Sequence, residues 1–118
     1  MKPLEVKLTI NKGSLDNWWV LERIEHDNKT WNEPMEYGSR YCMSRRLEKT
    51  TDIEGPAREW SAIRKAILDE TTISFTRCSI EHRKQGFLIE SPRNSQEPIL
   101  ISASSAIYLA NEIERKLG

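Results

Sequence analysis

The clearest structural pattern in this chain is the stretch GPAREWSAIRKAIL, residues 55–68. Trp60, Ile63 and Ile67 recur there at i, i+3 and i+7, a spacing that places side chains on one face of an α-helix. Pro56 suits the first turn of that helix, because the N–H that proline lacks has no helical partner at this position. The pattern predicts an amphipathic helix of about fourteen residues that packs its apolar face, Trp60 included, on a β-sheet.

Residues 71–82 follow this helix and predict a β-strand, because β-branched and aromatic side chains dominate them. The apolar side chains change parity between Phe75 and Cys78. We therefore expect a bulge in the strand, or an Arg77 side chain that turns inward. Residues 83–90 then predict a tight turn with a glycine, followed by the returning strand of a hairpin.

Two further strands are predicted before the helix. Residues 4–10 alternate apolar and polar side chains, which is typical of a strand with one face on the core. Residues 18–26 predict a second strand, in which Arg23 shares a face with Trp19 and Leu21. Two interpretations of this arginine stay open. Its stem packs on the aromatic side chains with the guanidinium in water, or the guanidinium faces a ligand.

The C-terminal part predicts a short apolar strand at residues 99–101 and then a second helix. Ser102 is a candidate helix cap, and Ala106, Ala110 and Ile113 lie on the apolar stripe that follows it. The complete order is strand, strand, irregular stretch, helix, strand, strand, helix. This order predicts one α+β domain over residues 1–118, an antiparallel β-sheet with two amphipathic helices packed on one side.

Composition limits the classes of function. The 118-residue chain is 37% hydrophobic and 31% charged, as expected for one globular domain. Its apolar runs are too short to cross a membrane, and its first residues do not resemble a signal peptide, so we expect a cytoplasmic protein with no membrane partner. The 18 basic residues equal the 18 acidic ones, and this balance argues against binding to duplex nucleic acid.

The sequence contains no pattern typical of catalysis. No GxSxG, HExxH or P-loop motif occurs. His26 and His82 each follow a glutamate, but neighbouring residues of a strand point to opposite faces and do not form a dyad. Cys42 and Cys78 lack the paired spacing of a zinc site, so we expect two reduced thiols. We accordingly expect no enzyme activity, no metal and no cofactor.

Two polar segments have the composition of anion-binding loops. Residues 40–49 hold four basic residues and one acidic residue, with tyrosines close by. Residues 91–95 (Ser-Pro-Arg-Asn-Ser) combine the guanidinium of Arg93, the amide of Asn94 and two hydroxyls. Arginine and aromatic side chains suit flat, phosphorylated ligands. The alternatives are a solvated loop and a turn whose side chains bond their own backbone.

Four short blocks carry a family resemblance: Gly38-Ser39-Arg40, Ile53-Glu54-Gly55, Arg77-Cys78-Ser79-Ile80-Glu81 and Ser91-Pro92-Arg93-Asn94-Ser95. Taken together they resemble the phage Thoeris anti-defence sponges of the first type, over roughly residues 17–117. The resemblance implies a protein that sequesters the glycocyclic ADP-ribose signals of bacterial Thoeris defence, and in some members the cyclic trinucleotides of CBASS, without cleaving them. It also implies dimers, or hexamers built from dimers, with ligand pockets at subunit interfaces in the cytoplasm of the infected host.

The same resemblance implies roles for individual residues. Arg40 and Arg93 would hold the phosphates of the cyclic ADP-ribose. Side-chain chemistry adds three expectations to the resemblance: the Asn94 amide suits a base edge, Arg77 is a partner of the 91–95 loop, and an adenine would stack on Phe75, Tyr41 or an arginine plane. Arg23 and Ser91 would serve a trinucleotide pocket, an assignment that follows from their position alone. Two other functions remain as alternatives: an enzyme that degrades such messengers, and an inhibitor that blocks a host protein by direct contact.

Overall fold

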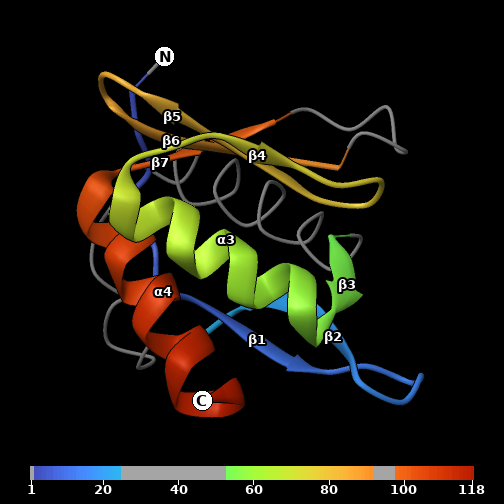
Figure 1. Cartoon of the computed structure of the whole chain (residues 1–118). Coiled ribbons are helices and arrows are strands. Elements are labelled where there is room, and N and C mark those ends of the chain that lie inside the picture. Colours follow the sequence, from blue (N-terminus) through green and yellow to red (C-terminus); the bar gives the residue numbers. More distant parts are fainter. Residues whose placement is uncertain (1, 25–52, 92–97) are drawn as a thin grey trace.

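The computed structural model of this chain describes residues 2–24, 53–91 and 98–118. Its elements are β1 (Leu8–Lys12), β2 (Trp18–Arg23), β3 (Glu54–Pro56), α3 (Ala57–Asp69), β4 (Ile73–Ser74), β5 (Ser79–Arg83), β6 (Gly86–Glu90), β7 (Ile99–Ile101) and α4 (Ala103–Leu117). The strands form a three-stranded sheet in the order β1-β2-β3 and a four-stranded sheet in the order β4-β5-β6-β7 (Figure 1). The predicted α+β class with antiparallel pairing is confirmed, although the strands divide between two sheets and do not form one.

The N-terminal segment is hydrogen-bonded to both sheets. The Leu4 N–H donates to the Leu100 carbonyl at 2.9 Å, and the Ser102 N–H donates to the Leu4 carbonyl at 3.0 Å. Three residues later the Ile24 N–H donates to the Lys7 carbonyl at 2.9 Å, and β1 then pairs with β2 along its length. The predicted strand of residues 4–10 therefore forms two separate pairings, one with each sheet.

The two helices pack against each other and contribute to one core. α3 contacts β2 and β3 of one sheet and β4 and β5 of the other, while α4 contacts β1 and β6 (Figure 1). An ion pair between Arg64 and Glu114, with N···O at 3.2 Å, joins the exposed sides of the helices. The core side chains from α3 are Trp60, Ile63, Ala66 and Ile67, and those from α4 include Ala106, Leu109, Ala110 and Ile113.

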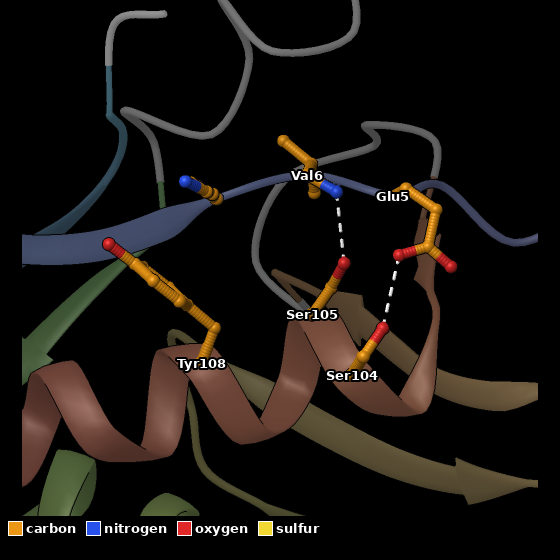
Figure 2. A pocket seen from close by; sticks show the side chains of 6 residues that line it. Glu5, Val6, Ser104, Ser105 and Tyr108 are labelled. Atoms are coloured by element: carbon orange, nitrogen blue, oxygen red, sulfur yellow. Dashed lines mark hydrogen bonds between the residues drawn. The ribbon is translucent and has the colours of Figure 1, made fainter.

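Local signals located the start of α4 correctly, whereas Pro56, predicted in the first turn of the other helix, is the N-cap residue of α3 and the last residue of β3. The Ser102 hydroxyl accepts the Ser105 N–H at 3.1 Å, so the predicted cap of α4 is confirmed. The Val6 N–H in turn donates to the Ser105 hydroxyl at 2.9 Å, which ties α4 to the N-terminal segment (Figure 2).

Trp60 is 1% exposed and belongs to the core, as predicted. Among the described residues, no helix has the length and apolar character needed to cross a membrane.

The prediction of one strand over residues 71–82 is wrong. The segment forms β4 and β5, which pair with each other as antiparallel strands. The Phe75 N–H donates to the Cys78 carbonyl at 2.9 Å and closes a turn between them. The chain reverses direction between β4 and β5, and this reversal, not a bulge, changes the parity of the apolar side chains. Arg77 therefore lies in the turn.

A polar network joins α4 to β1. The carboxylate of Glu112, 9% exposed, accepts two hydrogen bonds from Arg115 at 2.8 and 2.9 Å. These bonds lower the pKa of Glu112 from 4.5 to about 2 against the opposing effect of burial, and the Thr9 hydrogen bond and the charges of Arg115 and Lys116 lower it further. Lys116 also bonds the amide oxygen of Asn11. The ionised carboxylate therefore stabilises the contact between helix and sheet.

This network predicts a pH dependence. The pKa of Glu112 is depressed in the folded chain, so its ionised form contributes stability above the ordinary value of 4.5 that is lost as the pH falls toward about 2. Urea unfolding of the wild type and of Glu112→Gln should show a difference in free energy of unfolding that shrinks over this range. Glu81→Gln, which removes a carboxylate paired with Arg83 on the same strand, is measured in parallel as the control. A Glu112→Gln difference that is independent of pH contradicts the assignment.

A close approach between β6 and β7 predicts a glycine requirement. Gly86 has φ of 153°, and a Cβ there would overlap the carbonyl oxygen of Ile101. We expect Gly86→Ala to lower the free energy of unfolding by more than about 2 kcal/mol.

Gly55→Ala is the matched control. Its nearest neighbour would be the Glu59 carboxylate at 3.6 Å, an ordinary contact, so we expect a change below about 1 kcal/mol. Chemical denaturation of both variants measures the contrast, and equal losses would contradict it.

Candidate functional site

Arg77 extends from the turn between β4 and β5 to the other sheet. Its Nη1 lies 3.3 Å from Oε1 of Glu54 in β3, and its Cζ lies 5.4 Å from the ring centroid of Trp18 in β2. The arginine thus combines an ion pair with a cation–π contact. Its side chain remains 40% exposed and that of Glu54 33% exposed, so the guanidinium links the two sheets and stays accessible from solvent.

Phe75 and Ser91 lie at the same end of the four-stranded sheet as Arg77. Phe75 belongs to the same turn, and its partly buried ring packs against the core. Ser91, 6% exposed, directly follows Glu90, and Glu90 pairs with Ser79, the first residue of β5. We call these residues the Arg77 cluster: Trp18, Glu54, Phe75, Arg77 and Ser91.

Arg23 does not belong to this cluster within one chain. It ends β2 opposite Leu8, whereas Trp18 begins β2 opposite Pro56. Five residue steps along a strand correspond to about 16 Å. Arg23 is half-buried, and its Nη1 is buried, which argues against the interpretation that places the guanidinium in water.

Three predicted ligand residues, Arg40, Arg93 and Asn94, lie outside the described residues, as does the basic segment 40–49. Their roles stay predictions. Of the residues named from the sequence, the structure places Phe75, Arg77 and Ser91 at one end of the four-stranded sheet and places Arg23 away from Arg77.

Sequence reasoning missed Trp18 and Glu54 as partners of Arg77. Trp18 was seen only as part of a strand, and Glu54 only as part of a block of residues that carries the resemblance. Neither has a spacing relation to Arg77, because the contact forms between two different sheets. One sign in the sequence indicated that Arg77 is unusual: the apolar side chains change parity between Phe75 and Cys78. This change did not indicate which residues Arg77 contacts.

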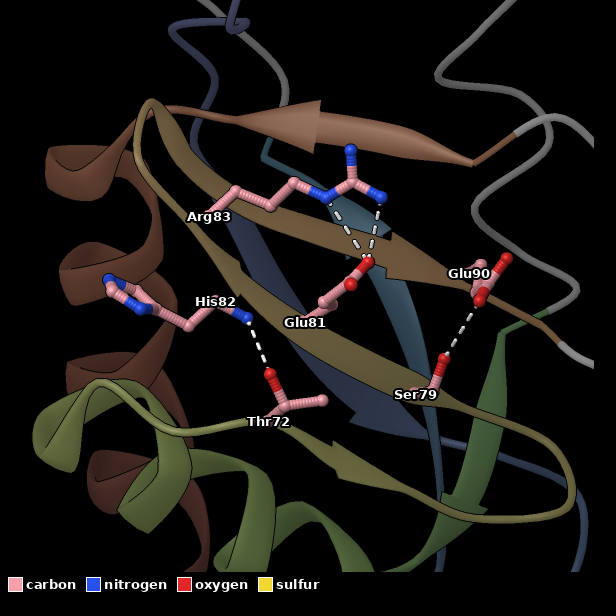
Figure 3. A network of polar contacts seen from close by, with 6 residues as sticks. All are labelled: Thr72, Ser79, Glu81, His82, Arg83 and Glu90. Carbon is pink, nitrogen blue, oxygen red and sulfur yellow. Dashed lines mark hydrogen bonds and ion pairs between the residues drawn. The ribbon is translucent and has the colours of Figure 1, made fainter.

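The described residues include one cysteine, Cys78, and one histidine, His82. Burial, and secondarily the Glu59 carboxylate, raise the pKa of the Cys78 thiol to about 12, so this thiol stays protonated and unreactive. Figure 3 shows the ring of His82 pointing away from Glu81, whose carboxylate instead accepts hydrogen bonds from Arg83 at 2.9 and 3.1 Å. In the part of the chain that the structure describes, no group of His, Cys, Asp and Glu side chains is placed to hold a metal ion.

Comparison with known proteins assigns no role to the Arg77 cluster. No protein-family model, curated protein or solved structure matches this chain. The function of the cluster is therefore argued from its chemistry: a solvent-accessible guanidinium held on an aromatic ring, with a second aromatic side chain and a hydroxyl at the same end of the sheet.

The link between the sheets predicts a stability effect. Arg77→Ala removes a cation–π contact worth about 0.5–1 kcal/mol and a half-exposed ion pair worth about 0–1 kcal/mol. We expect a loss of about 0.5–2 kcal/mol in the free energy of unfolding.

Arg83→Ala is the control, because it removes a similarly exposed ion pair, with Glu81, that lies within a single strand. We expect a loss below about 0.5 kcal/mol for this variant. Urea unfolding followed by tryptophan fluorescence measures both, and equal losses would exclude a linking role for Arg77.

Proposed function

We propose that this chain is a phage anti-defence sponge that binds and sequesters bacterial immune signalling nucleotides without cleaving them. The ligands are the glycocyclic ADP-ribose of Thoeris and the cyclic trinucleotides of CBASS, taken up in the cytoplasm of the infected host. The observation that supports this proposal is the half-exposed Arg77 guanidinium held on Trp18, with Phe75 and Ser91 at the same end of the sheet.

The chemistry of such ligands matches these groups. A pyrophosphate offers anionic oxygens to a guanidinium, and hydrogen bonds between charged partners are about twice as strong as neutral ones. A base offers a flat face, and its stacking on an aromatic side chain contributes about 1–3 kcal/mol in nucleic-acid complexes. Trp18 contacts the Arg77 guanidinium, and Phe75 belongs to the same turn as Arg77.

Glu54 must release Arg77, at least in part, when a phosphate binds. The pair has an N···O distance of 3.3 Å and both side chains are about one-third exposed or more, so its contribution is about 0–1 kcal/mol. A doubly charged pyrophosphate therefore competes effectively with one carboxylate. Glu54 keeps the guanidinium in position on Trp18 until the ligand arrives.

In this proposal the pocket is completed by Arg40, Arg93 and Asn94 and lies at an interface between two copies of the chain. Arg23, far along β2 from Arg77, belongs to a second type of pocket that takes the trinucleotides, and Ser91 reaches this pocket from another copy of the chain, because within one chain Ser91 lies in the Arg77 cluster. Homodimers, or hexamers built from dimers, are the assembled form. Native mass spectrometry measures this directly.

The decisive experiment is a capture-and-release assay. The protein is incubated with glycocyclic ADP-ribose or a cyclic trinucleotide, free ligand is removed, and the protein is then heat-denatured. Recovery of intact ligand supports the proposal, whereas recovery of hydrolysed product indicates a degrading enzyme. Absence of binding, together with one stoichiometric host protein in a pull-down, indicates inhibition by protein contact.

Substitution of the arginines tests the assignment of the site. Arg93→Ala should abolish the binding of glycocyclic ADP-ribose, and Arg77→Ala should weaken it by about tenfold or more, the loss expected for one charge-assisted hydrogen bond. Arg83→Ala, on another part of the sheet, should leave affinity unchanged. Calorimetry measures affinity and circular dichroism checks the fold. Unchanged affinity in a folded arginine variant removes that residue from the site.

A further inference from the structure

A cavity of about 280 Å³ lies where the N-terminal segment crosses the first turns of α4 (Figure 2). Its lining residues are Glu5, Val6, Lys7, Ser104, Ser105 and Tyr108. This volume lies just below the range typical of small-molecule pockets.

The cavity is separate from the Arg77 cluster. α4 begins after Ser102, and Ser102 lies against Gly86, the first residue of β6. Ser91 follows the last residue of the same strand. The length of β6, about 15 Å, therefore lies between the two places.

Hydrogen bonds hold the floor of the cavity in place. The Val6 N–H donates to the Ser105 hydroxyl at 2.9 Å, and that hydroxyl donates to the Leu4 carbonyl at 3.3 Å. Val6 and Ser105 are 5% and 4% exposed. The Ser104 hydroxyl donates to the Glu5 carboxylate at 3.0 Å and so holds this carboxylate at one side of the cavity (Figure 2).

The two ionised side chains of the cavity have opposite charges. Glu5 and Lys7 lie on either side of buried Val6 in an extended segment, so both project from the exposed face of this segment. The ammonium of Lys7 lies 5.7 Å from the ring centroid of Tyr108, while Glu5 is on the opposite side of the cavity (Figure 2). An anion would face the carboxylate, and a cation would face the ammonium. A molecule that carries both charges satisfies both.

The remaining surface is apolar or hydroxylic, contributed by Val6, the Tyr108 ring and two serines. From the paired charges and this surface, we propose that the cavity binds free aromatic α-amino acids as zwitterions. The ligand ammonium pairs with Glu5, the ligand carboxylate pairs with Lys7, and the ring lies against Tyr108. This site is independent of the nucleotide proposal, since none of its residues belongs to the Arg77 cluster.

The test uses L-phenylalanine and two analogues that each lack one charge. N-acetyl-L-phenylalanine lacks the cation, and L-phenylalanine amide lacks the anion. Amide chemical shifts of the intact protein are followed in a titration with each compound. We expect saturable shifts at Val6, Ser105 and Tyr108 with L-phenylalanine, and affinity for either analogue about tenfold weaker, the loss of one charge-assisted hydrogen bond.

Two charge-removing variants assign each contact. Glu5→Gln should weaken L-phenylalanine and the amide while leaving the N-acetyl compound unchanged. Lys7→Gln should weaken L-phenylalanine and the N-acetyl compound while leaving the amide unchanged. Glu81→Gln, an exposed carboxylate on β5, is the control and should alter none of the three.

Three outcomes overturn the proposal. One is the absence of saturable shifts at millimolar L-phenylalanine. Another is equal affinity for the zwitterion and both analogues. The third is a set of shifts confined to the Arg77 cluster. Because all three can be observed with a folded wild-type protein, they do not depend on the variants or on the outcome of the nucleotide assay.

Discussion

The backbone hydrogen bonding of the N-terminal segment is the constraint on which the rest of this fold depends. Leu4 pairs with the end of β7, and Lys7 and β1 pair with Ile24 and β2. Buried backbone N–H and C=O groups require hydrogen-bond partners. The N-terminal segment supplies such partners to strands of both sheets, and it thereby fixes the distance between the two sheets. The helices α3 and α4 pack within that arrangement, and their apolar faces form one core with both sheets.

Side chains from the opposite end of the molecule reinforce the same arrangement. The indole N–H of Trp60 donates to the Trp19 carbonyl at 3.1 Å, which attaches α3 to β2. Arg77 reaches from the four-stranded sheet to Trp18 and Glu54 of the other. Arg77 therefore lies at the junction between the two sheets. A junction between two sheets brings together side chains that are distant in sequence. Ligand pockets form preferentially at junctions between structural units.

The two candidate sites lie in different parts of the fold and offer different chemical groups to a ligand. The Arg77 cluster offers one cation with aromatic surface, which suits phosphate and base. The cavity beside α4 offers paired opposite charges around a hydrogen-bonded floor, which suits a small zwitterion. The buried Cys78, whose thiol has a raised pKa, and the Glu81 carboxylate, which accepts hydrogen bonds from Arg83, belong to neither site.

Local patterns in the sequence by themselves determined the α+β class, the helix around Trp60, the cap at Ser102 and the turn before Gly86. Each depends on residues within a few positions of one another, so periodicity, capping and turn chemistry suffice to predict it. Only the tertiary structure decided that residues 71–82 form two strands, that the strands divide into two sheets, and that Arg77 meets Trp18 and Glu54. These features depend on pairing between distant segments, whose register and partners are selected by the packing of the whole core and by no local pattern.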